Sequence, residues 1–234
     1  MMMIEKNNPG DASMTLCRTV LLTSGLALAL FCGAAQAQPA AQGGKLMMTL
    51  QMPATPDPAR VTLDPKTTAL MVLDYVEDIC NRQPSCKGQM LPAMTPFMER
   101  VRKAGLVVAY GTRERNMTHW LKEVAPAPGD IKVLNTAQDR FYNTDLDKAL
   151  KAKGIKTLIM VGWKISGSVT YTSVAAMAHD YTVVIPMDTT SASSGYETTI
   201  GFYNVLNSGN ANLANEPLKP KAVTLTRTDM ITFQ

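Results

Sequence analysis

Histidine and cysteine are scarce in this chain of 234 residues. It has two histidines, His119 and His179, which lie far apart in the sequence, and four cysteines. A metal centre of the zinc type needs several such side chains at short and regular spacing. Because no segment offers that spacing, the sequence predicts no metal site, and we expect no other cofactor.

Charged residues are also few, at 18% of the chain, and the net charge of +4 is spread without a basic run. Proteins that bind nucleic acids or membrane surfaces concentrate positive charge on one segment or face. We therefore expect neither kind of partner, and a small molecule becomes the expected ligand. The length and the 46% content of hydrophobic residues are typical of one globular domain with a sizeable core.

No apolar run is long enough for a stable membrane span. The longest, from Val20 to Phe31, follows Arg18 and precedes Ala35-Gln36-Ala37, the small-x-small pattern of a signal peptidase site. The sequence thus predicts a signal peptide over 1–37 with cleavage near Ala37, a flexible lead-in over 38–58 and a single domain over 59–234. A periplasmic or secreted location follows as an expectation.

The mature chain would keep only Cys80 and Cys86. Two thiols six positions apart in an oxidising compartment most simply form one local disulfide. A redox-active pair is the alternative, although the spacing is not the C-x-x-C of redox motifs.

Short apolar runs alternate with segments of helical spacing along residues 59–234. Strands are predicted over 68–74, 106–110, 131–134, 158–161, 182–185 and 222–226, and helices over 90–103, 145–153, from Ser168 onward and over 196–203. This alternation predicts a three-layer α/β/α sandwich around a mainly parallel sheet. Chemistry in such a fold lies beyond the carboxyl ends of the strands, which directs attention to the turn from Gly162 to Ser168.

Four motifs together resemble the isochorismatase-like, or cysteine hydrolase, superfamily over about residues 60–234. They are Val72-Leu73-Asp74, Phe141-Tyr142-Asn143-Thr144-Asp145-Leu146, the turn 162–172, and Pro186-Met187-Asp188-Thr189-Thr190-Ser191-Ala192. The resemblance implies a six-stranded, mainly parallel sheet and a homo-oligomer. It also implies a non-prolyl cis peptide bond before the nucleophile turn.

Active members of the family use an Asp, a Lys and a Cys nucleophile. By motif, the Asp falls on Asp74, but the nucleophile position holds Ser168 and the Lys position holds Asn135. The family's thiol chemistry therefore does not transfer directly. An Asp alone would suffice for the vinyl-ether hydrolysis that some members without the Cys perform.

We consider Asp74, Ser168 and Arg140 as candidate catalytic residues. Asp74 could act as an acid or base, or be a capping or hydrogen-bonded carboxylate. Ser168 could be a nucleophile, or an N-cap serine. The amides of Gly167 and Ser168 could form an oxyanion site at a helix N-terminus. Arg140 could replace the missing lysine as a charge clamp, or lie on the solvated surface.

Further candidates for substrate binding lie around the same turn. They are Asn135, Trp163, Lys164, Gly167 and Tyr171, for which packing or solvent exposure is the alternative. Glu197 could project into the site of a neighbouring subunit. Two hypotheses follow. The first is an exported hydrolase acting on a small amide or vinyl ether, and the second is a non-catalytic binder of the same fold.

Overall fold

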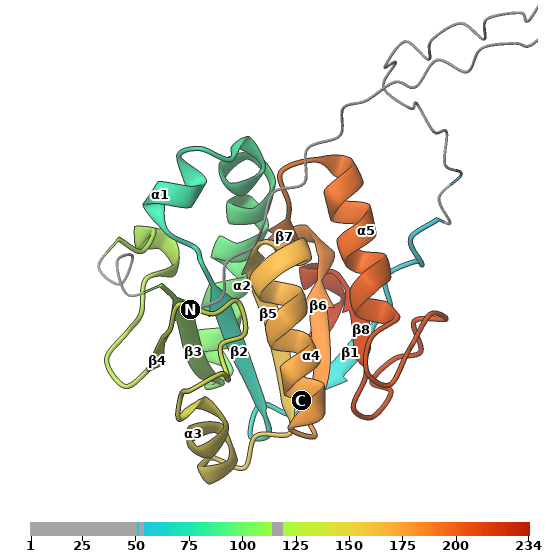
Figure 1. Ribbon diagram of the computed structural model, residues 1–234. Coiled ribbons are helices and arrows are strands. Elements are labelled where there is room, and N and C mark those ends of the chain that lie inside the picture. Colours follow the sequence, from blue (N-terminus) through green and yellow to red (C-terminus); the bar gives the residue numbers. More distant parts are fainter. Residues whose placement is uncertain (1–50, 52–53, 114–118) are drawn as a thin grey trace, which may run out of the picture. The chain divides into compact units, whose positions relative to one another are not determined.

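The computed structural model describes residue 51 and residues 54–113 and 119–234. The predicted signal peptide and most of the lead-in lie outside these residues. A parallel sheet runs through the domain in the order β4 (Ile131–Leu134), β3 (Val107–Thr112), β2 (Thr68–Leu73), β5 (Thr157–Trp163), β6 (Thr182–Pro186) and β8 (Val223–Thr226) (Figure 1). The two-residue β7 (Thr190–Ser191) pairs with the end of β5. The predicted parallel sheet is confirmed, and β2 and β5 lie at its centre.

Helices cover both faces of this sheet, as a three-layer fold requires. They are α1 (Glu77–Cys80), α2 (Leu91–Lys103), α3 (Leu146–Ala152), α4 (Thr170–Ala178) and α5 (Gly195–Leu206). Successive residues of β2 point to opposite faces: Met71 and Leu73 join the core beside α3, α4 and α5, and Leu70 and Val72 join the core beside α2. This two-sided burial explains the unbroken apolar run of β2. In the part of the chain that is described, no helix has the length and apolar character needed to cross a membrane.

Some elements differ from the predictions. Strands β1 (Val61–Leu63) and β9 (Ile231–Phe233) form a separate parallel pair, which was not predicted because three residues carry no readable period. Helix α5 extends three residues beyond the predicted Tyr203. The helix expected from Ser168 begins at Thr170, after a π-helical turn over Ile165–Val169. Short helical turns also occupy Cys86–Met90, Lys122–Val124, Met187–Thr189 and Thr228–Met230.

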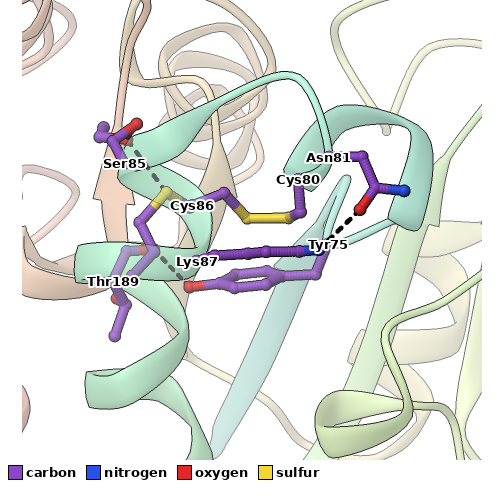
Figure 2. The surroundings of a disulfide bond; sticks show 9 residues. Tyr75, Cys80, Asn81, Ser85, Cys86, Lys87 and Thr189 are labelled. Atoms are coloured by element: carbon purple, nitrogen blue, oxygen red, sulfur yellow. Dashed lines mark hydrogen bonds between the residues drawn. A yellow bond between two sulfur atoms is a disulfide. The ribbon is translucent and has the colours of Figure 1, made fainter.

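The predicted disulfide joins Cys80 at the end of α1 to Cys86, with 5.1 Å between the two Cα atoms (Figure 2). Both cysteines are buried. Beside them, the Tyr75 hydroxyl donates a hydrogen bond to the Thr189 carbonyl at 2.8 Å, and burial raises the pKa of Tyr75. The Ser191 and Ser85 hydroxyls also bond at 2.9 Å. The disulfide segment, residues 75–86, is thus hydrogen-bonded to residues 189–191, next to the end of β5.

Candidate active site

The candidate site lies where the chain reverses its direction of travel across the sheet. From β2 the chain moves outward to β3 and β4, and then returns to the other side of β2 as β5. Ligands bind at such a switch point, beyond the carboxyl ends of the strands. Asp74 follows β2, Thr112 ends β3 and Ser168 lies in the turn after β5. Three strands therefore bring these polar side chains to one place.

Asp74 is buried and accepts hydrogen bonds on both carboxylate oxygens. The Thr112 hydroxyl donates to Oδ1 at 2.9 Å, and the Ser168 hydroxyl donates to Oδ2, also at 2.9 Å. The backbone of Asp74 has φ +56°, which Asp tolerates better than most residues, and its amide donates to the Gly111 carbonyl at 3.1 Å. This bend ends the strand and turns the carboxylate toward Ser168.

Arg140, in the loop between β4 and α3, is the ion-pair partner of Asp74. Its Nη2 lies 2.9 Å from Asp74 Oδ2, and the arginine side chain is 1% exposed. Its Nη1 donates to Asn135 Oδ1 and to the Ala137 carbonyl, both at 2.8 Å. Gly111 leaves room for it, since a Cβ there would lie 2.8 Å from Arg140 Cγ. Arg140 is therefore a buried clamp on Asp74, and the solvated alternative is wrong.

Asn135 occupies the position of the family lysine without replacing its charge. Its side-chain amide donates to the carbonyls of Asp139 and Tyr142 at 2.7 and 3.0 Å, while its oxygen accepts from Arg140. The predicted role in substrate binding does not agree with this geometry, because Asn135 supports Arg140 from behind and is not part of the cavity lining.

Ser168 is buried in the π-helical turn, after a cis peptide bond between Trp163 and Lys164. The resemblance implied such a bond. The N-cap of α4 is Val169, so the N-cap alternative for Ser168 is wrong, and the Ser168 hydroxyl faces Asp74. The Gly167 amide was expected to form part of an oxyanion site. It donates instead to the Lys164 carbonyl at 2.9 Å and is thus engaged within the turn.

A cavity of about 170 Å³ opens over Asp74 and Ser168. Of the candidate substrate-binding residues, Trp163, Lys164 and Gly167 line it, whereas Tyr171 is 54% exposed and does not. The sequence reasoning missed the other lining residues, Ile79, Arg82, Arg113, Ala137 and Gln138, as well as Thr112. The carboxyl-end rule could have found Thr112 and Arg113, had β3 been extended beyond Tyr110. Arg82, in the disulfide segment, carried no comparable signal.

Lys164 forms an ion pair with Glu197 of the same chain, at the start of α5. Glu197 also accepts a hydrogen bond from the Ser166 hydroxyl and another from the Ser193 amide. The Lys164 ammonium and the Ser166 hydroxyl lower the pKa of the Glu197 carboxyl to about 2. Glu197 therefore fastens the Ser168 turn to α5 in its own chain, rather than being free for a neighbouring subunit.

Replacing Glu197 by Gln is expected to lower the melting temperature at pH 7 by about 1–4 °C, as for a partly exposed ion pair. A lowered folded-state pKa adds stability that is present above the unfolded value of about 4.5 and is lost as the pH falls toward 2. The difference between wild type and variant should therefore shrink between pH 4.5 and 2. Thermal unfolding at pH 7, 4 and 3 measures it, and a difference that stayed constant would contradict the assignment.

The comparison with known families agrees with this geometry. The model of the isochorismatase domain matches residues 68–214, which is more than half of the chain. The match includes Asp74, Thr112, Arg140 and Ser168. The chain belongs to the isochorismatase family. Within this family, the chain keeps the Asp and the cis peptide bond of the resemblance, and it carries Ser168 and Asn135 at the other two positions.

Curated relatives in the family include ureidoacrylate amidohydrolases. The protein from Caulobacter segnis is 26% identical over 161 residues, covering 48% of this chain and 66% of that relative. The protein from Rhizobium rhizogenes is 36% identical over 70 residues, covering 30% and 27%. The chain therefore matches less than two thirds of the length of these relatives.

Solved structures share the fold. N-carbamoylsarcosine amidase from Thermoplasma acidophilum superposes with a TM-score of 0.58 at 21% identity, covering 70% of this chain and 97% of that one. A cysteine hydrolase from Pseudomonas syringae pv. phaseolicola superposes with a TM-score of 0.60 at 18% identity, covering 75% and 95%. At these identities the likeness establishes the α/β fold, with its central parallel sheet between helices.

Proposed function

We propose that this protein is a hydrolase of small amide-type substrates in which Asp74 is the base and Ser168 the nucleophile. The observation that carries the proposal is the 2.9 Å hydrogen bond from the Ser168 hydroxyl to Asp74, beneath a cavity at the switch point of the sheet. A serine needs a base within hydrogen-bond reach to attack a carbonyl carbon. The hydrolase names of the curated relatives and of the amidase support the same class of reaction.

The hydrogen bonds of Asp74 favour a base over an acid. Both of its oxygens accept, from Thr112, Ser168 and Arg140, and arginine can only donate. An Asp that accepts from the Ser168 hydroxyl is placed as a base toward that hydroxyl, whereas vinyl-ether hydrolysis needs an Asp that gives a proton. We therefore place amides ahead of vinyl ethers. Negative charge that develops on the substrate would lie near the N-terminal end of α4, where the helix dipole is favourable.

A non-catalytic binder is the second candidate, and one observation favours it. Within the described part of the chain, no histidine lines the cavity. Lys164 is occupied by Glu197, so Asp74 would have to activate Ser168 without a second base. Such a protein would keep the cavity and bind a small molecule without turning it over.

The deciding experiment is a screen of the protein against small amides, nitriles and vinyl ethers. Ser168→Ala and Asp74→Asn are each expected to lower amide turnover by about 10³-fold or more, because nucleophile and base act as a unit. Tyr171→Phe, on the exposed face of α4, should leave turnover unchanged and serves as the matched control.

Other outcomes of this screen discriminate among the hypotheses. Turnover lost in Asp74→Asn but kept in Ser168→Ala would replace the serine nucleophile by acid-catalysed addition of water. A ligand that raises the melting temperature without being turned over by the wild type would favour the binder.

We further propose that the protein acts outside the cytoplasm, as a homo-oligomer. The small-x-small site at Ala35–Ala37 and the buried disulfide support export, because such bonds persist in oxidising compartments. The oligomer rests on the family resemblance.

A further inference from the structure

The side chains that line the cavity over Ser168 include more positive charges than the ion pair between Asp74 and Arg140 accounts for. Among the described residues that line it, four side chains are cationic and one, Asp74, is a carboxylate. Arg140 is committed to Asp74, and Lys164 is committed to Glu197. Arg82 and Arg113 remain, so the described residues that line the cavity carry an excess of positive charge that these internal pairs do not balance.

The two remaining guanidinium groups are weakly engaged by the protein. Arg82 lies 3.9 Å from Asp78, and both side chains are more than 60% exposed, a geometry that contributes little stability. Arg113 makes no ion pair with the residues that the structure describes. Both groups are therefore free to bind an anion that enters the cavity.

We propose that Arg82 and Arg113 are specificity residues that recognise a carboxylate on the substrate. The inference rests on the proposed function in one respect, namely that this cavity is the substrate site. A guanidinium presents a planar fork of donors that matches a carboxylate. The volume of about 170 Å³ is below the roughly 300–1,000 Å³ of sites for drug-sized ligands. The substrate class is thus a small amide that also carries a carboxylate.

The disulfide holds Arg82 at the mouth of the cavity. Arg82 lies two residues after Cys80, inside the segment that the bridge closes, and its amide donates to the Ile79 carbonyl at 3.0 Å. Ser85 bonds to Ser191, which in turn pairs with Trp163 at the end of β5. Figure 2 shows the bridge with Ser85 and Thr189 close by. One covalent link and this strand pair therefore fix Arg82 relative to the Ser168 turn.

The test compares the binding of malonate with that of malonamide, its neutral diamide, by calorimetry at constant ionic strength. The wild type should bind malonate at least about tenfold more tightly, as charge-assisted hydrogen bonds to guanidinium require. Arg82→Gln and Arg113→Gln should each remove most of this preference. Arg60→Gln, an exposed arginine that does not line the cavity, is the matched control and should keep it.

A second comparison tests the role of the disulfide. Replacing Cys80 and Cys86 by Ser should weaken malonate binding in the wild type, but should weaken it little further in the Arg82→Gln background. Such non-additivity marks two changes that act through one group. An equal loss in both backgrounds would overturn the positioning role of the bridge.

The outcomes separate this proposal from the proposed function. Equal binding of malonate and malonamide, absence of binding by either, or an unchanged preference in both arginine variants would overturn the recognition of a carboxylate. Ser168→Ala should keep the preference for malonate. If the preference for malonate held while no amide was ever turned over, the proposed hydrolase function would be contradicted. The proposed recognition of a carboxylate would still be supported.

Discussion

Replacing Arg140 by Met is expected to lower the free energy of unfolding by about 3–5 kcal/mol, because it leaves the Asp74 carboxylate buried without its ion-pair partner. Asp74 and Arg140 have side chains that are 7% and 1% exposed, so water cannot replace the lost contact at little cost. Denaturant unfolding of wild type and variant measures the difference. The loss is large beside the 5–15 kcal/mol of a typical domain.

A double variant shows whether the loss comes from the uncompensated charge. Asp74→Asn combined with Arg140→Met removes both charges, and it should be more stable than Arg140→Met alone. If the losses in the free energy of unfolding from the two substitutions simply added, the broken ion pair would not be the reason for the instability of Arg140→Met. The comparison also gives a folded reference if the single variant does not fold.

Replacing Gly162 by Ala is expected to cost more than about 4 kcal/mol, at the upper end of single-substitution effects. Gly162 has φ +132°, and a Cβ there would lie 1.9 Å from the Leu73 carbonyl oxygen. That oxygen belongs to the neighbouring central strand, one residue before Asp74, and backbone there has little freedom to move. Loss of soluble protein, or a matching fall in the unfolding midpoint, would be the result.

Gly154→Ala is the matched control for this prediction. Gly154 also has a positive φ, +72°, but no atom lies within 4 Å of the place that a Cβ would take there. It should therefore show only the cost of the left-handed backbone, about 1–2 kcal/mol. Equal losses in the two variants would indicate that the dihedral angle, and not the contact with Leu73, sets the cost at Gly162.

The sheet could be predicted from the sequence because its central strands are buried on both faces. A run such as Thr68–Leu73 is apolar throughout for that reason, and such runs are readable without a structure. The pair β1–β9 could not be predicted, since its short strands carry no pattern and pair between the two ends of the described chain. The start of α4 at Thr170 rather than at Ser168 was likewise hidden, because the Ser168 hydroxyl donates to Asp74, 94 residues away.

The candidate site was predictable at the carboxyl ends of β2 and β5, where position and motif agree. Asp74 and Ser168 were found in that way, and Arg140 was found by its place before the Phe141 motif. Arg82 needed the fold, because its approach to the cavity depends on the disulfide segment, whereas Thr112 and Arg113 were missed because the predicted strand ended at Tyr110. Asn135 and Tyr171 show the converse, since alignment by motif or turn gives a position along the chain and not the direction of a side chain.

The pairing of β1 with β9 brings the two ends of the folded domain together. Val61–Leu63 lies directly beside Ile231–Phe233, and the Gln234 amide donates to the Leu63 carbonyl at 3.1 Å. Neighbouring ends of this kind are the condition under which circular permutation is tolerated. A short linker could join them, and new termini could be opened in the proline-rich segment Pro126–Gly129, away from the residues that line the Ser168 cavity. We therefore expect a circularly permuted chain with these new termini to form the same sheet.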